Sequence, residues 1–122
     1  MNITVYAASS GQVPEVYTQA AARLGEILAE RSHILINGAG RTGLMGATID
    51  ACVEKGGKAI GIIPQFMIDE SWQHKGMTEL VITPNMHERK TMMADHADAC
   101  IACPGGVGTL EELLEEIGRA HV

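Results

Sequence analysis

Short apolar runs alternate along this chain with longer stretches in which apolar residues recur at helical spacing. The runs are rich in β-branched residues and end at turn-forming residues. Such alternation is typical of a parallel β-sheet whose strands are joined by crossover helices. The sequence predicts strands at residues 2–7, 33–37, 58–63, 80–83 and 99–103. We therefore expect an α/β fold with a doubly wound parallel sheet.

Proline and glycine set the limits of the expected helices. Pro14 is placed to open the first helix and Gly56 to end the second, because proline fits a first helical turn and glycine fits a helix end. The predicted helices cover residues 14–30, 44–55 and 85–96, with a further helix from residue 110 onward. Residues 65–77 follow neither periodicity and hold the only tryptophan, so we expect an irregular segment that acts as a mobile flap.

The length of the chain fits one domain, residues 1–122, since 46% hydrophobic residues suffice for a single core. The chain stops inside or just after the last predicted helix, and no predicted strand follows. A doubly wound sheet usually continues at that point. We expect either a chain that lacks its C-terminal strand and helices or a sheet that a partner subunit completes.

Charge and hydropathy exclude several classes of partner. The formal net charge of −6 argues against a nucleic-acid partner, which needs a basic face, but allows a small anion held by a local cluster of donors. No apolar run approaches the roughly 20 residues that span a bilayer, and the N-terminus lacks a signal-peptide pattern. Three cysteines, an odd number, fit a reducing compartment. We expect a cytoplasmic protein without a membrane partner.

The strongest chemical pattern is a glycine-rich turn, residues 104–109, between the last predicted strand and the last predicted helix. The free N–H groups and the positive dipole end of a helix N-terminus suit a phosphate, and glycines let the anion approach the backbone. The candidate phosphate ligands are Gly105, Gly106, Gly108 and Thr109. The alternative is a glycine-rich turn that binds nothing.

Four glutamates crowd the first turns of the helix that follows this turn. Carboxylates favour a helix N-terminus by a few tenths to about 1 kcal/mol, so none of them requires a chemical role. Glu112, however, lies three residues after Thr109, on the face of the turn. A carboxylate there would stabilise an oxocarbenium-like transition state at C1′ of a ribose while orienting or deprotonating water. Spacing alone leaves Glu111 and Glu115 as rivals.

A cationic segment, residues 86–90, directly follows a predicted strand. Arg89 would hold phosphate or ribose oxygens as a fork, and Lys90 would act as a compact point charge. The alternative is a solvated, charged helix face. The position after the carboxyl end of a strand favours the binding role, because ligands bind at that edge of such sheets.

Residues 38–43 match the GxGxxG pattern between a strand and a helix, which is typical of dinucleotide binding. The second requirement fails, because the next strand ends at Pro64 with no acid for a ribose hydroxyl. We expect instead a second close-approach loop that borders the same pocket. Ser9 and Ser10 follow the first strand and are either hydroxyl donors to this pocket or polar turn residues.

No metal site is expected from the cysteines and histidines. Cys100 and Cys103 stand three residues apart on a predicted strand, so their side chains point to opposite faces and do not share a metal. Both are predicted to be small, buried core residues. The methionines near residue 90 are predicted to fill the core, and the histidines lack convincing ligand partners: His33, His74, His87 and His96.

Taken together, these motifs resemble those of one family. The turn and its glutamates (PGGVGTLEE), the upstream MHERK, GLMG in the second loop and AIGIIP in the third strand are similar to the LONELY GUY family. Its members are cytokinin riboside 5′-monophosphate phosphoribohydrolases, long described as possible lysine decarboxylases. The resemblance covers nearly all of the chain. It implies a Rossmann-like fold, a homodimer or larger homo-oligomer, and neither a metal nor a cofactor.

The resemblance also implies a reaction and its residues. Arg89 and Glu112 match the catalytic positions. The implied reaction is hydrolysis of the N-glycosidic bond of a purine nucleoside 5′-monophosphate, AMP or an N6-substituted cytokinin form, to free base and ribose 5-phosphate. The substrate-binding residues would be Ser9, Gly43, Glu79, Met86, Lys90, Gly105, Gly106, Gly108 and Thr109.

Two other interpretations fit the same residues. A nucleotide-binding carrier or sensor without turnover would use the same fold and the same phosphate turn. A nonfunctional fragment would carry the motifs without a complete sheet. A lysine decarboxylase is not supported, because no lysine stands in a convincing setting for pyridoxal phosphate.

Overall fold

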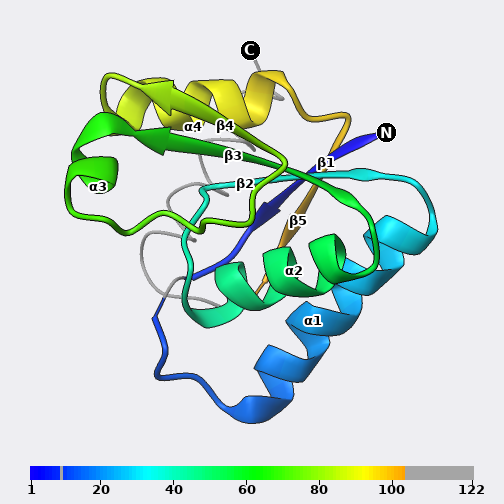
Figure 1. Ribbon diagram of the computed structural model, residues 1–122. Coiled ribbons are helices and arrows are strands. Elements are labelled where there is room, and N and C mark those ends of the chain that lie inside the picture. Colours follow the sequence, from blue (N-terminus) through cyan, green and yellow to red (C-terminus); the bar gives the residue numbers. More distant parts are fainter. Residues whose placement is uncertain (9, 104–122) are drawn as a thin grey trace.

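The computed structural model describes residues 1–8 and 10–103, and these form an α/β fold (Figure 1). The strands of the described part are β1 (Asn2–Tyr6), β2 (Ile34–Asn37), β3 (Lys58–Pro64), β4 (Glu79–Thr83) and β5 (Ala99–Ala102). Its helices are α1 (Glu15–Glu30), α2 (Gly43–Glu54), α3 (Gln65–Asp69) and α4 (Met86–Asp95). The helix predicted from residue 110 lies outside the described residues.

All neighbouring strands of the described sheet are parallel, in the order β4-β3-β2-β1-β5. The chain adds three strands on one side of β1 and then returns to place β5 on the other side, where Tyr6 pairs with Ala102. The predicted doubly wound α/β fold is thus confirmed. Because the strands are parallel, their carboxyl ends share one edge, which is where such sheets bind ligands.

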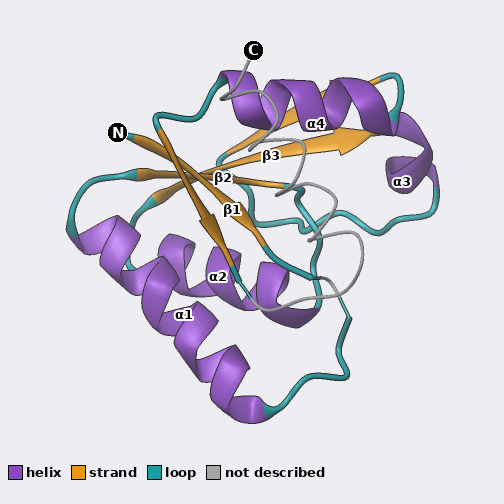
Figure 2. Ribbon diagram, turned by 180° about the vertical axis from the view of Figure 1, so that it is seen from behind, coloured by secondary structure: helices purple, strands orange, loops and turns teal. Residues whose placement is uncertain are grey.

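Helices cover both faces of the sheet. Helices α1 and α2 lie on one face and α4 on the other, as the front and back views show (Figures 1 and 2). Successive strand residues supply the two cores: Leu35 packs in the cluster of α1 and α2, and Ile36 packs beside Met93 of α4. The buried hydroxyl of Thr4 donates a hydrogen bond to the carbonyl of Met93 (2.8 Å), which satisfies this polar group inside the second core.

The segment expected to be irregular, residues 65–77, begins with a short helix, α3. Pro64, predicted to stop the strand, is the last residue of β3 and also the N-cap of α3. A five-residue helix is little more than one turn, so it repeats no apolar position that a period of 3.6 would reveal.

The prediction of a buried Cys100 is wrong, because this side chain is exposed, whereas Cys103 is partly buried. Side chains alternate along β5, so Ile101 faces the cluster formed with α1 and α2 while Cys100 faces the other way. On that second face, the buried cluster under α4 is built on β1, β2 and β3, and no residue of β5 belongs to it. The predicted lack of a shared metal does not depend on this burial.

Helices α1 and α2 cross closely at Gly25 of α1. A Cβ atom at this position would overlap the backbone carbonyl oxygen of Thr48 in α2. A carbonyl inside a helix cannot move aside as a flexible side chain does, so glycine sets the distance between the two helices.

We expect Gly25→Ala to lower the free energy of unfolding by about 1–3 kcal/mol, because overpacking a close contact outweighs the better helix propensity of alanine. Urea unfolding followed by circular dichroism measures this change. Gln19→Ala, on the exposed surface of the same helix, is the control and should retain the parental midpoint. An unchanged midpoint for Gly25→Ala would show that the crossing tolerates a side chain.

Candidate functional site

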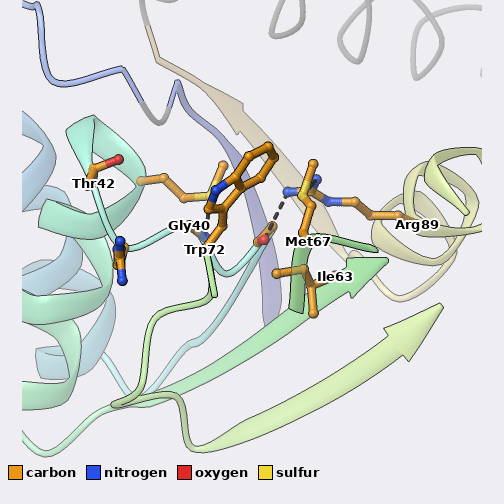
Figure 3. A pocket seen from close by; sticks show the side chains of 9 residues that line it. Gly40, Thr42, Ile63, Met67, Trp72 and Arg89 are labelled. Atoms are coloured by element: carbon orange, nitrogen blue, oxygen red, sulfur yellow. Dashed lines mark hydrogen bonds between the residues drawn. The ribbon is translucent and has the colours of Figure 1, made fainter. Parts of the chain in front are cut away.

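A pocket of about 370 Å³ opens at the carboxyl edge of β2 and β3 (Figure 3). Its volume falls within the range of small-molecule sites, about 300–1,000 Å³. The lining residues come from the β2–α2 loop, α2, β3, the segment after β3 and α4: Gly38, Gly40, Arg41, Thr42, Met45, Ile63, Met67, Trp72 and Arg89. The parallel sheet therefore gathers at one edge residues that are far apart in the sequence.

Arg89 enters the pocket from the first turns of α4. Asn85 fixes the start of this helix, because its side-chain oxygen accepts a hydrogen bond from the backbone N–H of Glu88 (2.8 Å). One turn into the helix, the side chain of Arg89 is only 6% exposed. Its Nη2 donates to the carbonyl oxygen of Gly38 (2.9 Å), and its Nη1 lies 3.4 Å from the sulfurs of Met67 and Met86.

The place of Arg89 depends on the absence of a side chain at Gly38. A Cβ atom on Gly38 would overlap the guanidinium of Arg89. The adjoining loop is held by Asn37, whose side-chain oxygen accepts from the backbone N–H of Ala39 (2.9 Å), and Ala39 itself has a positive φ of 62°. The glycine-rich loop borders the described pocket, and the described group that approaches it closely is an arginine.

One wall of the pocket is apolar. Met45, Ile63 and Met67 contribute aliphatic and thioether surface, and the indole of Trp72 lies between the loop at Gly40 and the side chain of Met67 (Figure 3). The indole is half exposed. A flat aromatic surface next to polarisable sulfurs suits stacking against a planar heteroaromatic ring.

The charge of the pocket is opposite to that of the whole chain. Among the described residues, the ionisable side chains that line it are Arg41 and Arg89, both cations, although the chain carries a formal net charge of −6. Backbone groups and the hydroxyl of Thr42 add neutral polar surface. The arrangement therefore suits an anionic ligand with a planar apolar part.

The structure brings together some of the predicted site residues. Gly43 ends the loop that lines the pocket and has a positive φ of 65°. Met86 contacts the guanidinium of Arg89 through its sulfur, and Lys90 is the next residue of α4, half-buried and outside the pocket lining. Glu79 lies apart, exposed at the amino end of β4, and does not line the pocket. The binding role of these residues stays a prediction.

The other predicted site residues lie outside the described part of the chain. They are Ser9, Gly105, Gly106, Gly108, Thr109 and the predicted catalytic Glu112.

The apolar wall was not predicted from the sequence. Met67 and Trp72 carry no motif, and Met45 and Ile63, which stand in the GLMG and AIGIIP motifs, were not among the predicted site residues. The available signal was the single tryptophan in a segment without periodicity that directly follows a strand. A large aromatic side chain in such a place has no core face to join, so a ligand contact was the better expectation.

Cysteines and histidines form no catalytic or metal cluster in the described residues. No group of three or more His, Cys, Asp or Glu side chains there is placed to hold a metal ion. Burial raises the pKa of the thiols of Cys52 and Cys103 above the ordinary value, so both stay protonated near neutral pH and are poor nucleophiles. His74 is not isolated as expected, because its Nε2 lies 2.5 Å from Oδ1 of Asp50.

Comparison with known proteins places this sequence beside one group of enzymes. The family model described as "Possible lysine decarboxylase" matches residues 45–122. A cytokinin riboside 5′-monophosphate phosphoribohydrolase of Arabidopsis thaliana is 42% identical over 120 residues, which are 98% of this chain and 53% of that protein. The enzyme of the same name from Rhodococcoides fascians is 38% identical over 122 residues, 99% of this chain and 62% of that protein. The chain thus spans little more than half the length of these relatives.

Solved structures support the fold. The molybdenum cofactor binding protein of Rippkaea orientalis superposes with a TM-score of 0.86 at 22% identity, over 98% of this chain and 71% of that one. The molybdenum cofactor carrier protein of Chlamydomonas reinhardtii gives 0.85 at 23% identity, over the same shares. At such low identity these structures speak for the fold alone.

We expect Gly38→Ala to expel the guanidinium of Arg89 from its place against residue 38. Loss of a hydrogen bond from a charged donor costs about 1.5–3 kcal/mol, so modification of Arg89 by phenylglyoxal should become at least about tenfold faster. Peptide mapping by mass spectrometry separates Arg89 from the other arginines. Gly11→Ala is the matched control, because a Cβ on Gly11 meets nothing within 4 Å. Equal rates in the parent and both variants would contradict this account of the loop.

Proposed function

This chain belongs to the LONELY GUY family, whose family model is described as "Possible lysine decarboxylase", and we propose that it hydrolyses purine nucleoside 5′-monophosphates. The products would be a free base and ribose 5-phosphate. The proposed substrates are AMP and its N6-substituted cytokinin forms. The relatives are named for this activity, and the chain covers 53% and 62% of the first two.

The observation that carries the proposal is the composition of the pocket. Two arginines supply its described charge, and an indole, an isoleucine and two methionine side chains supply its wall. A nucleoside monophosphate combines a phosphate dianion with a planar base, so it matches both features. Position at the carboxyl edge of a doubly wound sheet further supports a nucleotide ligand.

In the proposed mechanism, different residues of the chain contact the phosphate and the ribose of the substrate. Gly105, Gly106, Gly108 and Thr109 would hold the phosphate at a helix N-terminus. Glu112 would stabilise the positive charge at C1′ of the ribose and orient a water molecule. The water oxygen then bonds to C1′ while the bond from C1′ to the base nitrogen breaks, and a proton goes to the departing base.

Arg89 would orient the substrate or assist the departing base. Its burial and its hydrogen bond to Gly38 hold the guanidinium in one place, so it is preorganised for either role. Ser9, Gly43, Met86 and Lys90 would complete the binding site. A binding role for Glu79 is supported only by the resemblance of the chain to the family.

We further propose a homodimer or larger homo-oligomer located in the cytoplasm. The described helices include none that is long and apolar enough to cross a membrane. The acidic net charge of −6 supports a small-molecule partner over a nucleic acid.

A carrier or sensor of a nucleotide without turnover is the second candidate. The two superposed structures are named for binding or carrying a molybdenum cofactor, and the same fold therefore serves proteins named for binding instead of hydrolysis. Decarboxylation of lysine has less support, because none of the described residues that line the pocket is a lysine able to hold pyridoxal phosphate.

We expect Glu112→Gln to lower the rate of base release from AMP and from isopentenyladenosine monophosphate by about a hundredfold or more, because the amide no longer stabilises the positive charge at C1′. Chromatography of the free base measures the rate. Glu111→Gln and Glu115→Gln are the matched variants, because spacing alone left both as rivals, and each should retain most of the activity. Full activity of Glu112→Gln would refute the mechanism. AMP binding by the parent without base release would favour the carrier.

A further inference from the structure

The orientation of Trp72 depends on the backbone that carries it. The indole lines the pocket, yet half of its surface (50%) is exposed. A ring with so little packing of its own takes its direction from the chain on either side. The contacts of the residues just after Trp72 therefore determine the shape of the apolar wall of the pocket.

His74, two residues after Trp72, is fixed both by its backbone and by its side chain. Its N–H donates to the carbonyl of Ala39 (2.7 Å), next to an antiparallel bridge between Gly40 and Gln73. Its imidazole is only 14% exposed. These contacts bring the segment after α3 against the loop after β2, so the two walls of the pocket meet here.

Both nitrogens of the imidazole are engaged. Nδ1 accepts a hydrogen bond from the backbone N–H of Gly76 (2.8 Å), and Nε2 lies 2.5 Å from Oδ1 of Asp50. Because an N–H can only donate, Nδ1 must present its lone pair, and the ring proton is then on Nε2. This proton points to a carboxylate, which makes the hydrogen bond a charge-assisted one.

The hydrogen bond between Asp50 and His74 lies outside the pocket and connects the two segments that form its sides. Asp50 belongs to α2, which begins at Gly43 and carries the Met45 side of the pocket. His74 belongs to the segment that carries Met67 and Trp72. Neither Asp50 nor His74 lines the pocket itself.

We propose that Asp50 and His74 are positioning residues: their hydrogen bond latches the segment of Trp72 to α2 and so fixes the surface on which the base of a nucleotide stacks. The identity of the ligand rests on the proposed function, whereas the latch itself does not. The chain contains one tryptophan, so the intrinsic tryptophan fluorescence of the protein reports on this wall directly.

Two substitutions of His74 separate its two hydrogen bonds. His74→Gln retains an N–H near the place of Nε2 and loses the acceptor for Gly76. His74→Asn retains an acceptor near the place of Nδ1 and loses the donor to Asp50. Asp50→Ala removes the carboxylate, and Glu54→Ala, an exposed acid on the same helix, is its control.

We expect Asp50→Ala and His74→Asn to shift the emission of Trp72 to longer wavelength, to raise its quenching by acrylamide and to weaken AMP binding by about three- to tenfold. His74→Gln and Glu54→Ala should remain close to the parent. The Asp50→Ala/His74→Asn double variant should be no worse than either single variant, because both remove one and the same contact. Far-UV circular dichroism establishes that each variant is folded.

The outcomes separate the latch from the proposed function. If the parent does not bind AMP but Asp50→Ala and His74→Asn still change the fluorescence, the latch stands and the nucleotide proposal fails. If both variants keep the parental fluorescence and AMP affinity, the latch is refuted. Equal effects of His74→Gln and His74→Asn would also refute it, since the bond to Asp50 would then not matter. Should Asp50→Ala not fold, this comparison of the two His74 variants decides alone.

Discussion

The pocket depends on one contact, in which the guanidinium of Arg89 occupies the space that a side chain at Gly38 would fill. The contact joins α4, on one face of the sheet, to the loop that leads into α2, on the other face. A buried arginine is costly unless its donors are satisfied, and the carbonyl of Gly38 satisfies one of them, Nη2, at 2.9 Å. The glycine pattern that a dinucleotide site would use for its phosphates here admits a cation, so the loop and α4 together place positive charge beside the pocket.

The same contact bears on how an acidic chain would hold the proposed anionic substrate. Net charge governs long-range attraction and excludes extended polyanions, but a small ligand senses mainly the groups within a Debye length, about 8–10 Å. Among the described residues, the ionisable side chains that line the pocket are Arg41 and Arg89. Positive charge that is confined to a concave site would favour the binding of small anions over the binding of nucleic acid.

The sequence predicted the features that repeat and missed those that occur once. Strands and long helices repeat an apolar position, so the sheet and most element limits were predictable. Arg89 was predicted near the carboxyl edge because it stands in the first turns of a helix that follows a strand. The single turn of α3 and the indole of Trp72 belong to no repeating pattern of apolar residues, so the sequence did not predict them. Glu79 shows a different limit: it stands near residues 86–90 in sequence, but a five-residue strand separates it from the carboxyl edge, a distance of roughly 13–17 Å.

The topology also bears on how one substrate could reach both parts of the proposed site. The strand order reverses between β1 and β5, and residues 104–109 follow directly in sequence on Cys103, whose N–H donates to the carbonyl of Tyr6 at the end of β1. The described pocket lies at the ends of β2 and β3, two to three strands from β5. At about 4.8 Å per strand this is roughly 10–15 Å. A ligand that contacts both the end of β5 and the described pocket must therefore be elongated, as phosphate, ribose and base in a row are. A free base is too short to span this distance, so the spacing favours a whole nucleotide over the free base.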